Sequence, residues 1–333
     1  MTPATDLFDR PLRDLRISVT DRCNFRCTYC MPKEVFGPGY EFLPRDQLLT
    51  FEEIVSVVGH FTERGVNKVR ITGGEPLLRK GIEDLIEMIA AGGVEDLTLT
   101  TNASLLSRKA EALASAGLDR VTVSLDAMDD ATFQQMNDVG FPVSTVLDAI
   151  EDAAMAGLGP IKVNAVIKKG VNEHSVVDMA RHFKGSKHIV RFIEYMDVGN
   201  TNGWRLDDVV SAERMVEMID AVFPLEAVPP NYPGEVASRF RYRDGSGEIG
   251  VIASVTKPFC GSCTRARVSA EGTLYTCLFA SGGTSLREVI RSGGDLGQTI
   301  DEVWAKRDDR YSEIRSSNTA RLSVPVEMSY IGG

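Results

Sequence analysis

The sequence lacks long hydrophobic runs. Its longest stretch without a charged residue, 272–286, is 15 residues long, and eight of these are Gly, Ser or Thr. A membrane-spanning helix needs about 20 mostly apolar residues, so none is expected. The first twenty residues contain Asp6, Arg10 and Arg13, with neither the apolar core of a signal peptide nor an Arg-rich, acid-poor transit pattern. We therefore expect a cytoplasmic protein without a membrane partner.

Positive charge is also scarce. Lys and Arg number 37 against 47 Asp and Glu, which gives a net charge of −10. Broad nucleic-acid binding rests on an excess of positive charge, so no nucleic-acid partner is expected. A small anionic ligand needs only a few Arg or Lys side chains in one pocket, and the net charge does not exclude it. The 333 residues, 43% hydrophobic and 25% charged, predict a main domain with a smaller part.

The cysteines form two groups of three, and each group lacks a fourth member. The groups are Cys23, Cys27, Cys30 and Cys260, Cys263, Cys277. Three disulfides suit small secreted domains better than a chain of this size. Structural zinc usually takes four Cys or His ligands, and no histidine lies near either group in sequence, although folding could bring one. Thiolates are the usual ligands of iron–sulfur clusters, so we predict a 4Fe-4S cluster in each group, with one iron open to a small molecule.

Six β-rich segments alternate with segments whose apolar residues recur at three- and four-residue steps. The predicted strands are 15–19, 68–72, 97–101, 120–125, 161–167 and 188–193. Such alternation predicts parallel strands with helical crossovers and functional loops after the strands. We expect an α/β fold with a partial, open six-unit (β/α) barrel in residues 1–223. A smaller C-terminal α+β part, 224–333, begins with a linker containing Pro229 and Pro230 and carries the second cluster.

The first cysteine group follows the first predicted strand as Cys23-x3-Cys27-x2-Cys30, with Tyr29 before the last cysteine. This motif resembles that of radical S-adenosylmethionine (SAM) enzymes, whose CxxxCxxC loop holds a 4Fe-4S cluster with an open iron that binds SAM. The resemblance implies a barrel of the radical SAM type and a reduced cluster that splits SAM to leave a 5'-deoxyadenosyl radical.

The same resemblance implies that loops after the strands contact SAM. The implied SAM-binding residues are Tyr29, Gly73, Gly74, Glu75, Ser124 and Met196. Taken alone, the segment Gly73-Gly74-Glu75-Pro76 is typical of a plain turn into a helix. A hydroxyl at a strand end often caps the next helix, and a lone Met usually fills a core.

The second cysteine group encloses the segment Thr264-Arg265-Ala266-Arg267. With the early segment 15–18 and the terminal Gly332-Gly333, it resembles the GTP 3',8-cyclases of molybdenum-cofactor biosynthesis over essentially the whole chain. That resemblance implies a lyase that uses the radical to remove hydrogen from the ribose 3' carbon of GTP, which then joins guanine carbon 8. The implied product is (8S)-3',8-cyclo-7,8-dihydroguanosine 5'-triphosphate. It also implies that guanine binds the second cluster, that the Gly-Gly tail enters the active site, and that the protein is a homodimer served by an unidentified electron donor.

Arg265 and Arg267 alternate along a predicted strand, so both side chains point to one face. With Arg16 they could bind a triphosphate through charge-assisted hydrogen bonds, although alternating arginines are also common on solvated faces. Arg70 and Lys162 lie in predicted barrel strands, where a buried cation needs an anionic partner. The predicted substrate-binding set is Arg16, Arg70, Thr101, Lys162, Arg265, Ala266 and Arg267. The six cysteines with Gly332 and Gly333 form the predicted catalytic set.

Two alternatives stay open from the sequence. A radical SAM peptide maturase with an auxiliary cluster would share the first cysteine motif but need a groove for a polypeptide. A zinc-bearing interaction protein without catalysis would contain no acid-labile sulfide.

Overall fold

Six parallel strands form the centre of the protein, whose computed structural model describes residues 4–315 and 325–332. They are β1 (Asp14–Ser18), β2 (Lys68–Thr72), β3 (Asp96–Thr101), β4 (Arg120–Ser124), β5 (Lys162–Ile167) and β6 (Ile189–Glu194). Each pairs in parallel with the next in sequence order. The predicted strands are confirmed, with ends shifted by at most one residue.

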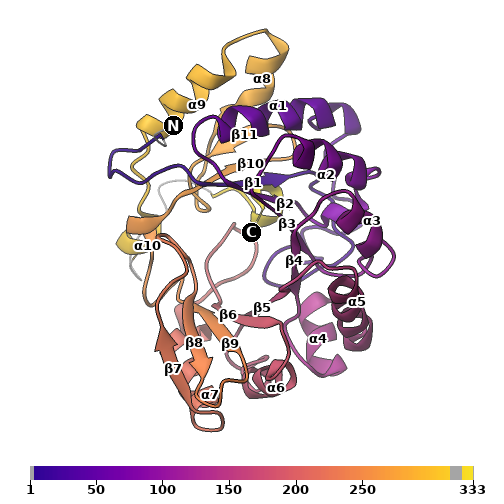
Figure 1. Cartoon of the computed structure of the whole chain (residues 1–333), viewed down its shortest axis with the longest axis vertical. Helices are drawn as coiled ribbons and strands as arrows, with labels where there is room; N and C mark the ends of the chain where they lie inside the picture. Colours follow the sequence, from indigo (N-terminus) through magenta and orange to yellow (C-terminus); the bar gives the residue numbers. More distant parts are fainter. Residues whose placement is uncertain (1–3, 316–324, 333) are drawn as a thin grey trace.

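Helices cover the outer side of these strands (Figure 1). They are α1 (Phe51–Thr62), α2 (Ile82–Ala91), α3 (Ala110–Ser115), α4 (Asp130–Asn137), α5 (Val143–Met155), α6 (Ser175–Phe183) and α7 (Ala212–Asp220). Helix α1 shows why they form. Thr50 and Glu53 make a capping box at its start, and its apolar residues at three- and four-residue steps, from Ile54 to Phe61, are buried. The apolar stripe fixes which face of the helix packs on the sheet.

Strands from the C-terminal part extend both edges of the sheet. At one edge β10 (Arg265–Val268) pairs in parallel with β1 and is followed by antiparallel β11 (Thr273–Tyr275) and β12 (Thr284–Ser285). At the other, β9 (Glu248–Ile252) pairs in parallel with β6, followed by antiparallel β8 (Ser238–Tyr242) and β7 (Leu225–Val228). The strand order therefore begins with β12 and ends with β7, so the barrel is open, as predicted.

The remaining elements are short. They are the helices α8 (Leu286–Arg291), α9 (Leu296–Ala305), α10 (Tyr311–Ile314) and α11 (Met328–Ile331), and the 3-10 turns η1 (Arg45–Gln47), η2 (Pro76–Leu78), η3 (Leu206–Asp208) and η4 (Cys260–Ser262). The last described residues lie near the middle of the molecule, inside the curve of the sheet (Figure 1). Within residues 4–315 and 325–332, no helix has the length and apolar character that a membrane crossing requires.

Alternation along each strand separates the core from the interior of the barrel. In β2, Val69 and Ile71 belong to the hydrophobic core, whereas Lys68, Arg70 and Thr72 line the central cavity. This follows from the two-residue period of a strand, which sends successive side chains to opposite faces. Polar side chains are thus collected on the concave face, where a ligand can reach them.

Candidate active site

All six cysteines line one cavity of about 310 Å³ inside the curve of the sheet. The first triplet lies in the loop after β1; in the second, Cys260 lies in η4, Cys263 directly after it and Cys277 after β11. The volume falls within the range of roughly 300–1,000 Å³ that is typical of small-ligand pockets. Folding therefore brings together two cysteine triplets that lie far apart in the sequence.

The cysteine arrangement fits a cluster at each triplet. All six thiols are free of disulfides and half-buried. Across the described parts of the chain, no group of three or more His, Cys, Asp or Glu is placed to hold a single metal ion. A single ion needs donors that converge on one point, whereas a 4Fe-4S cluster takes one thiolate at each of three separate irons. The two groups of three free thiols that line the cavity therefore suit 4Fe-4S clusters better than single metal ions.

The two triplets differ in their electrostatics. Burial and, after it, the charge of Glu75 raise the pKa of Cys23 to about 12. Burial alone would also raise the pKa of Cys263, but the positive charges of Arg265 and Arg307 outweigh it and lower that pKa to about 6. Arg265 donates from Nη2 to the Cys263 Sγ over 3.0 Å. Positive charge is therefore concentrated at Cys263, since burial and then the charge of Asp309 raise the pKa of Cys277, in the same triplet, to about 11.

Tyr29 is oriented by the carboxylate of Asp126, in the loop after β4. Its hydroxyl donates to Asp126 Oδ2 over 2.9 Å, and Asp126 Oδ1 accepts a bond from the backbone N–H of Val166. Burial raises the pKa of Asp126 to about 6. Both Tyr29 and Asp126 line the cavity beside the first triplet.

The two glycines after β2 allow a close approach between two loops. A Cβ on Gly73 would lie 2.4 Å from the carbonyl oxygen of Thr20, and one on Gly74 would lie 2.3 Å from that of Arg22. Larger residues at these positions would push the loop away from the backbone that leads into the first cysteine motif. Gly73, Gly74 and Cys23 all line the cavity.

Glu75 orders the loops and does not line the cavity. It accepts hydrogen bonds from the backbone N–H groups of Leu77 and Asn102, over 3.0 and 2.7 Å, and from the Thr101 hydroxyl over 2.8 Å. Burial raises the pKa of Glu75 to about 7, although these hydrogen bonds oppose the rise. The carboxylate therefore ties the loop after β2 to the end of β3.

Cationic side chains gather on the concave face. Those that line the cavity are Arg16, Lys68, Arg70, Lys162, Arg191, Arg265, Arg267 and Arg307. Burial, followed by repulsion from neighbouring cations, lowers the pKa of Arg16 to about 9 and that of Lys162 to about 7. Buried like charges disfavour one another, so an anion in the cavity would relieve the repulsion.

The C-terminal segment reaches this cationic group. The carbonyl oxygen of Gly332 accepts a hydrogen bond from Arg267 Nη1. Gly332 has a φ of 74°, and a Cβ there would lie 2.3 Å from Thr72 Cγ2. Met328 and Ser329 line the cavity. The predicted approach of the tail thus agrees with the position of Gly332, while Gly333 lies outside the described residues.

The other predicted site residues differ in whether they line the cavity. Thr101, Ser124 and Met196 line the cavity. Ala266 does not, because it alternates with Arg265 and Arg267 on β10 and its side chain packs into the hydrophobic core.

Sequence reasoning missed several cavity residues. They include Lys68, Asn164, Arg191 and Arg307. Lys68 and Arg191 carried the same signal that singled out Arg70 and Lys162, a cation within an otherwise apolar strand. No local pattern marks Arg307, because tertiary packing brings it to the site.

Two family models match the chain. Residues 17–183 match the radical SAM superfamily, and residues 188–313 match the Molybdenum Cofactor Synthesis C family. The chain therefore belongs to the radical SAM superfamily. A GTP 3',8-cyclase from Acidothermus cellulolyticus is 52% identical and covers 99% of both chains. Another from Staphylococcus saprophyticus is 48% identical, covering 99% of this chain and 98% of its own. Within the superfamily, the chain belongs to the GTP 3',8-cyclase family.

Solved structures confirm the predicted fold. Streptococcus suis SuiB bound to S-adenosylmethionine matches with a TM-score of 0.63 at 16% identity, over 94% of this chain and 69% of SuiB. The protein anSMEcpe with bound AdoMet matches with a TM-score of 0.55 at 16% identity, over 88% of this chain and 84% of that one. Both likenesses concern the fold.

Proposed function

We propose that this protein is a radical SAM lyase that converts GTP to (8S)-3',8-cyclo-7,8-dihydroguanosine 5'-triphosphate, the first step of molybdenum-cofactor biosynthesis. The observation that carries the proposal is the single cavity that both cysteine triplets and a group of buried cations share. Two thiolate triplets that each leave one iron open, together with cations in the same cavity, suit a substrate that is an anion at one end and a nitrogen heterocycle at the other. GTP has this character.

The enzyme uses two 4Fe-4S clusters and SAM. We assign the first cluster to Cys23, Cys27 and Cys30, and the second to Cys260, Cys263 and Cys277. When bound and reduced, the first cluster supplies the electron that splits SAM into methionine and a 5'-deoxyadenosyl radical. Tyr29, Gly73, Gly74, Ser124 and Met196 would hold SAM from the cavity wall, all of them lining residues. Glu75 would act indirectly, by holding Thr101 and the Asn102 backbone in place.

The cationic side chains would bind the triphosphate. Arg16, Arg70, Lys162, Arg265 and Arg267 form the proposed set, and the cavity adds Lys68 and Arg191. Arginine suits this role because its guanidinium group donates paired hydrogen bonds to phosphate oxygens. With the guanine directed to the second triplet, both ends of the nucleotide are fixed.

Fixing both ends serves the reaction by orientation. Removal of hydrogen from the ribose 3' carbon leaves a carbon radical, which adds to guanine carbon 8 within the same molecule. An electron and a proton then complete the product. Holding the two carbons close together lowers the entropic part of the activation free energy for ring closure. Thr101, the backbone of Ala266 and the tail residues Gly332 and Gly333 are proposed to complete the substrate pocket.

We also propose a division of the chain into a barrel, 1–223, and a C-terminal part, 224–333, that supplies the second cluster. An electron donor from outside the chain reduces the first cluster. The homodimer and the cytoplasmic location rest on family resemblance and on the composition of the chain.

Anaerobic metal analysis followed by a turnover assay tests the function. The purified protein should contain iron and acid-labile sulfide in equal amounts. With SAM, a strong reductant and GTP, it should release 5'-deoxyadenosine and a nucleotide isomeric with GTP, both measured by mass spectrometry. Release of 5'-deoxyadenosine with a peptide and not with GTP would favour a peptide maturase. Zinc without acid-labile sulfide would contradict the radical SAM function.

A further inference from the structure

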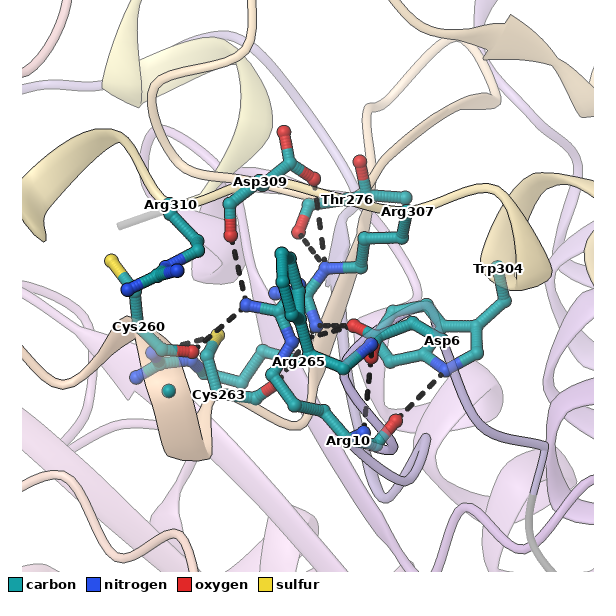
Figure 2. A network of polar contacts seen from close by, with 12 residues as sticks. Asp6, Arg10, Cys260, Cys263, Arg265, Thr276, Trp304, Arg307, Asp309 and Arg310 are labelled. Atoms are coloured by element: carbon teal, nitrogen blue, oxygen red, sulfur yellow. Dashed lines mark hydrogen bonds and ion pairs between the residues drawn. The ribbon is translucent and has the colours of Figure 1, made fainter. Parts of the chain in front are cut away.

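A buried ionic cluster lies behind the second cysteine triplet. Asp6 accepts bonds at Oδ2 from Arg10 Nε, over 2.6 Å, and from Arg307 Nη1, over 3.0 Å. The side chains are 0%, 2% and 1% exposed, respectively. We call these three residues the Asp6 cluster; Figure 2 shows them beside Cys260 and Cys263. One carboxylate thus joins two arginines from opposite ends of the chain.

Both arginines also hold the backbone at the second triplet. Arg10 Nη1 donates to the Cys260 carbonyl over 2.9 Å, and Arg307 Nη1 donates to the Cys263 carbonyl over 2.8 Å. Arg307 Nε donates to the carbonyl of Thr276, directly before Cys277, over 3.1 Å. Every cysteine of the triplet is therefore held at its own or the preceding carbonyl. The Cys260 carbonyl also accepts from the backbone N–H of Cys263 over 3.1 Å, within η4, so Arg10 is a second donor to it.

Aromatic rings hold the two guanidinium groups in place. Arg307 lies over the Trp304 ring at 4.6 Å, and Arg10 lies over the Phe8 ring at 5.0 Å. The Trp304 indole N–H donates to the Arg10 carbonyl over 3.3 Å. With both arginines fixed by rings, backbone and carboxylate, the Asp6 cluster can set the relative positions of the cysteine loops.

The two arginines of the Asp6 cluster are balanced by two carboxylates, because Arg307 Nε also pairs with Asp309 Oδ2 at 3.6 Å. Arg265, which donates to the Cys263 Sγ, adds a further positive charge at the second triplet. At the first triplet, the arginine that donates to backbone carbonyls is Arg26, which lies within the cysteine motif itself. It donates to the carbonyls of Cys23 and Phe25, over 2.8 and 2.7 Å. A cubane with three thiolates is anionic and becomes more so when reduced. Positive charge nearby therefore favours reduction, because net charge and hydrogen bonds set cluster potentials.

We propose that Asp6, Arg10 and Arg307 are positioning residues for the second cluster, which keep its cysteine loops at the spacing for cluster binding and raise its reduction potential. The inference rests on the proposed assignment of the second triplet as cluster ligands. None of the three residues needs to touch the reacting atoms, so their effect reaches the reaction through the cluster they support.

The test uses a parent variant, Cys23→Ala with Cys27→Ala and Cys30→Ala, which retains the second triplet alone. Arg307→Gln in this parent removes the charge and two donors to carbonyls. After anaerobic reconstitution and a chelator challenge, we expect bound iron to fall at least twofold, and the midpoint potential of the remaining cluster, from an EPR redox titration, to become more negative. Asp6→Asn, which leaves both arginines without their shared carboxylate, should also lower bound iron.

Matched controls keep the outcomes distinct. Arg64→Gln breaks another arginine–aspartate pair, Arg64 Nε with Asp301 Oδ1 at 2.7 Å, away from the cysteines, and should change neither iron nor potential. If Arg307→Gln loses its cooperative thermal transition, Arg307→Lys is judged by the same two measurements. Iron and potential equal to the parent's in both Arg307 and Asp6 variants would overturn this inference and leave the proposed function intact. A parent without iron would overturn the cluster assignment as well.

Discussion

Arg16 and Arg70 lie directly beside each other on the adjacent parallel strands β1 and β2, and both line the cavity. Arg16 has a second arginine, Arg267, as its register partner on β10. Three cations thus form a row across neighbouring strands. After burial, repulsion from Arg70 is the largest cause that lowers the pKa of Arg16, to about 9. Such a row is unfavourable in the free protein and favourable once an anion binds.

Arg16→Met should therefore stabilise the free protein and weaken GTP binding. The substitution removes one of the mutually repelling charges while keeping apolar volume, so the melting temperature of the free protein should rise. GTP affinity should fall by about tenfold or more, which corresponds to about 1.4 kcal/mol. Differential scanning calorimetry and isothermal titration measure the two effects. Arg205→Met, at an exposed arginine, is the control; an Arg16→Met protein that binds GTP like the unaltered protein would contradict the proposed phosphate site.

Lys162 should make stability depend on pH. Burial and then neighbouring arginines lower its pKa in the folded protein to about 7, whereas in the unfolded chain it has the ordinary value of about 10.4. Between these two values the unfolded chain binds more protons, so this lysine destabilises the fold most below about pH 7, and the penalty shrinks as pH rises. Urea unfolding at several pH values should show the unaltered protein gaining stability relative to Lys162→Met across this window. A difference that stays constant with pH would contradict the assignment.

Gly332→Ala should impair turnover without loss of the clusters. The new Cβ would meet Thr72 Cγ2 at 2.3 Å, and a φ of 74° adds roughly 1–2 kcal/mol of backbone strain. We expect the tail to leave its position and product formation to fall at least about tenfold, or about 1.4 kcal/mol, with iron content unchanged. Thr72→Ser, which removes Cγ2, should restore part of the activity in the double variant.

Gly293→Ala is the matched control for Gly332→Ala. Gly293 has a similar φ of 73°, but a Cβ there meets nothing within 4 Å. Activity should therefore stay near that of the unaltered protein. Equal losses in the two alanine variants would mean that backbone strain, and not the contact with Thr72, causes the effect.

The two triplets should be separable by substitution. Cys27→Ala should remove about half of the bound iron and abolish SAM cleavage, because the proposed SAM-binding cluster is lost. Cys263→Ala should remove the other half, retain SAM cleavage and abolish cyclisation. Iron analysis and 5'-deoxyadenosine measurement distinguish the two. Loss of SAM cleavage in both variants, with the folded state intact, would contradict the division of roles.

Much of the barrel could be predicted because its signals are local. A strand such as β2 alternates apolar and polar side chains within five residues, and helix α1 carries both its cap and its apolar stripe. The cysteine spacing and the cations within strands are local in the same sense, and they led to all six cysteines and to five of the cations that line the cavity.

Interactions between distant segments could not be predicted in this way. The glycines at 73 and 74 are explained by the backbone of Thr20 and Arg22, and Glu75 by Thr101 and Asn102. The bond between Asp6 and Arg307 joins residues 301 positions apart. Such contacts form only in the folded protein, and the spacing of residues in the sequence does not predict them.

We propose that one cavity holds the ribose 3' carbon of GTP against the radical formed at the first triplet. This placement is tested by incubation of the reconstituted protein with SAM, reductant and GTP deuterated at the 3' carbon. We expect deuterium to appear in 5'-deoxyadenosine, measured by mass spectrometry, and none to be transferred from GTP deuterated at the 2' carbon. Unlabelled 5'-deoxyadenosine from the 3'-deuterated substrate, formed alongside the cyclised nucleotide, would contradict it.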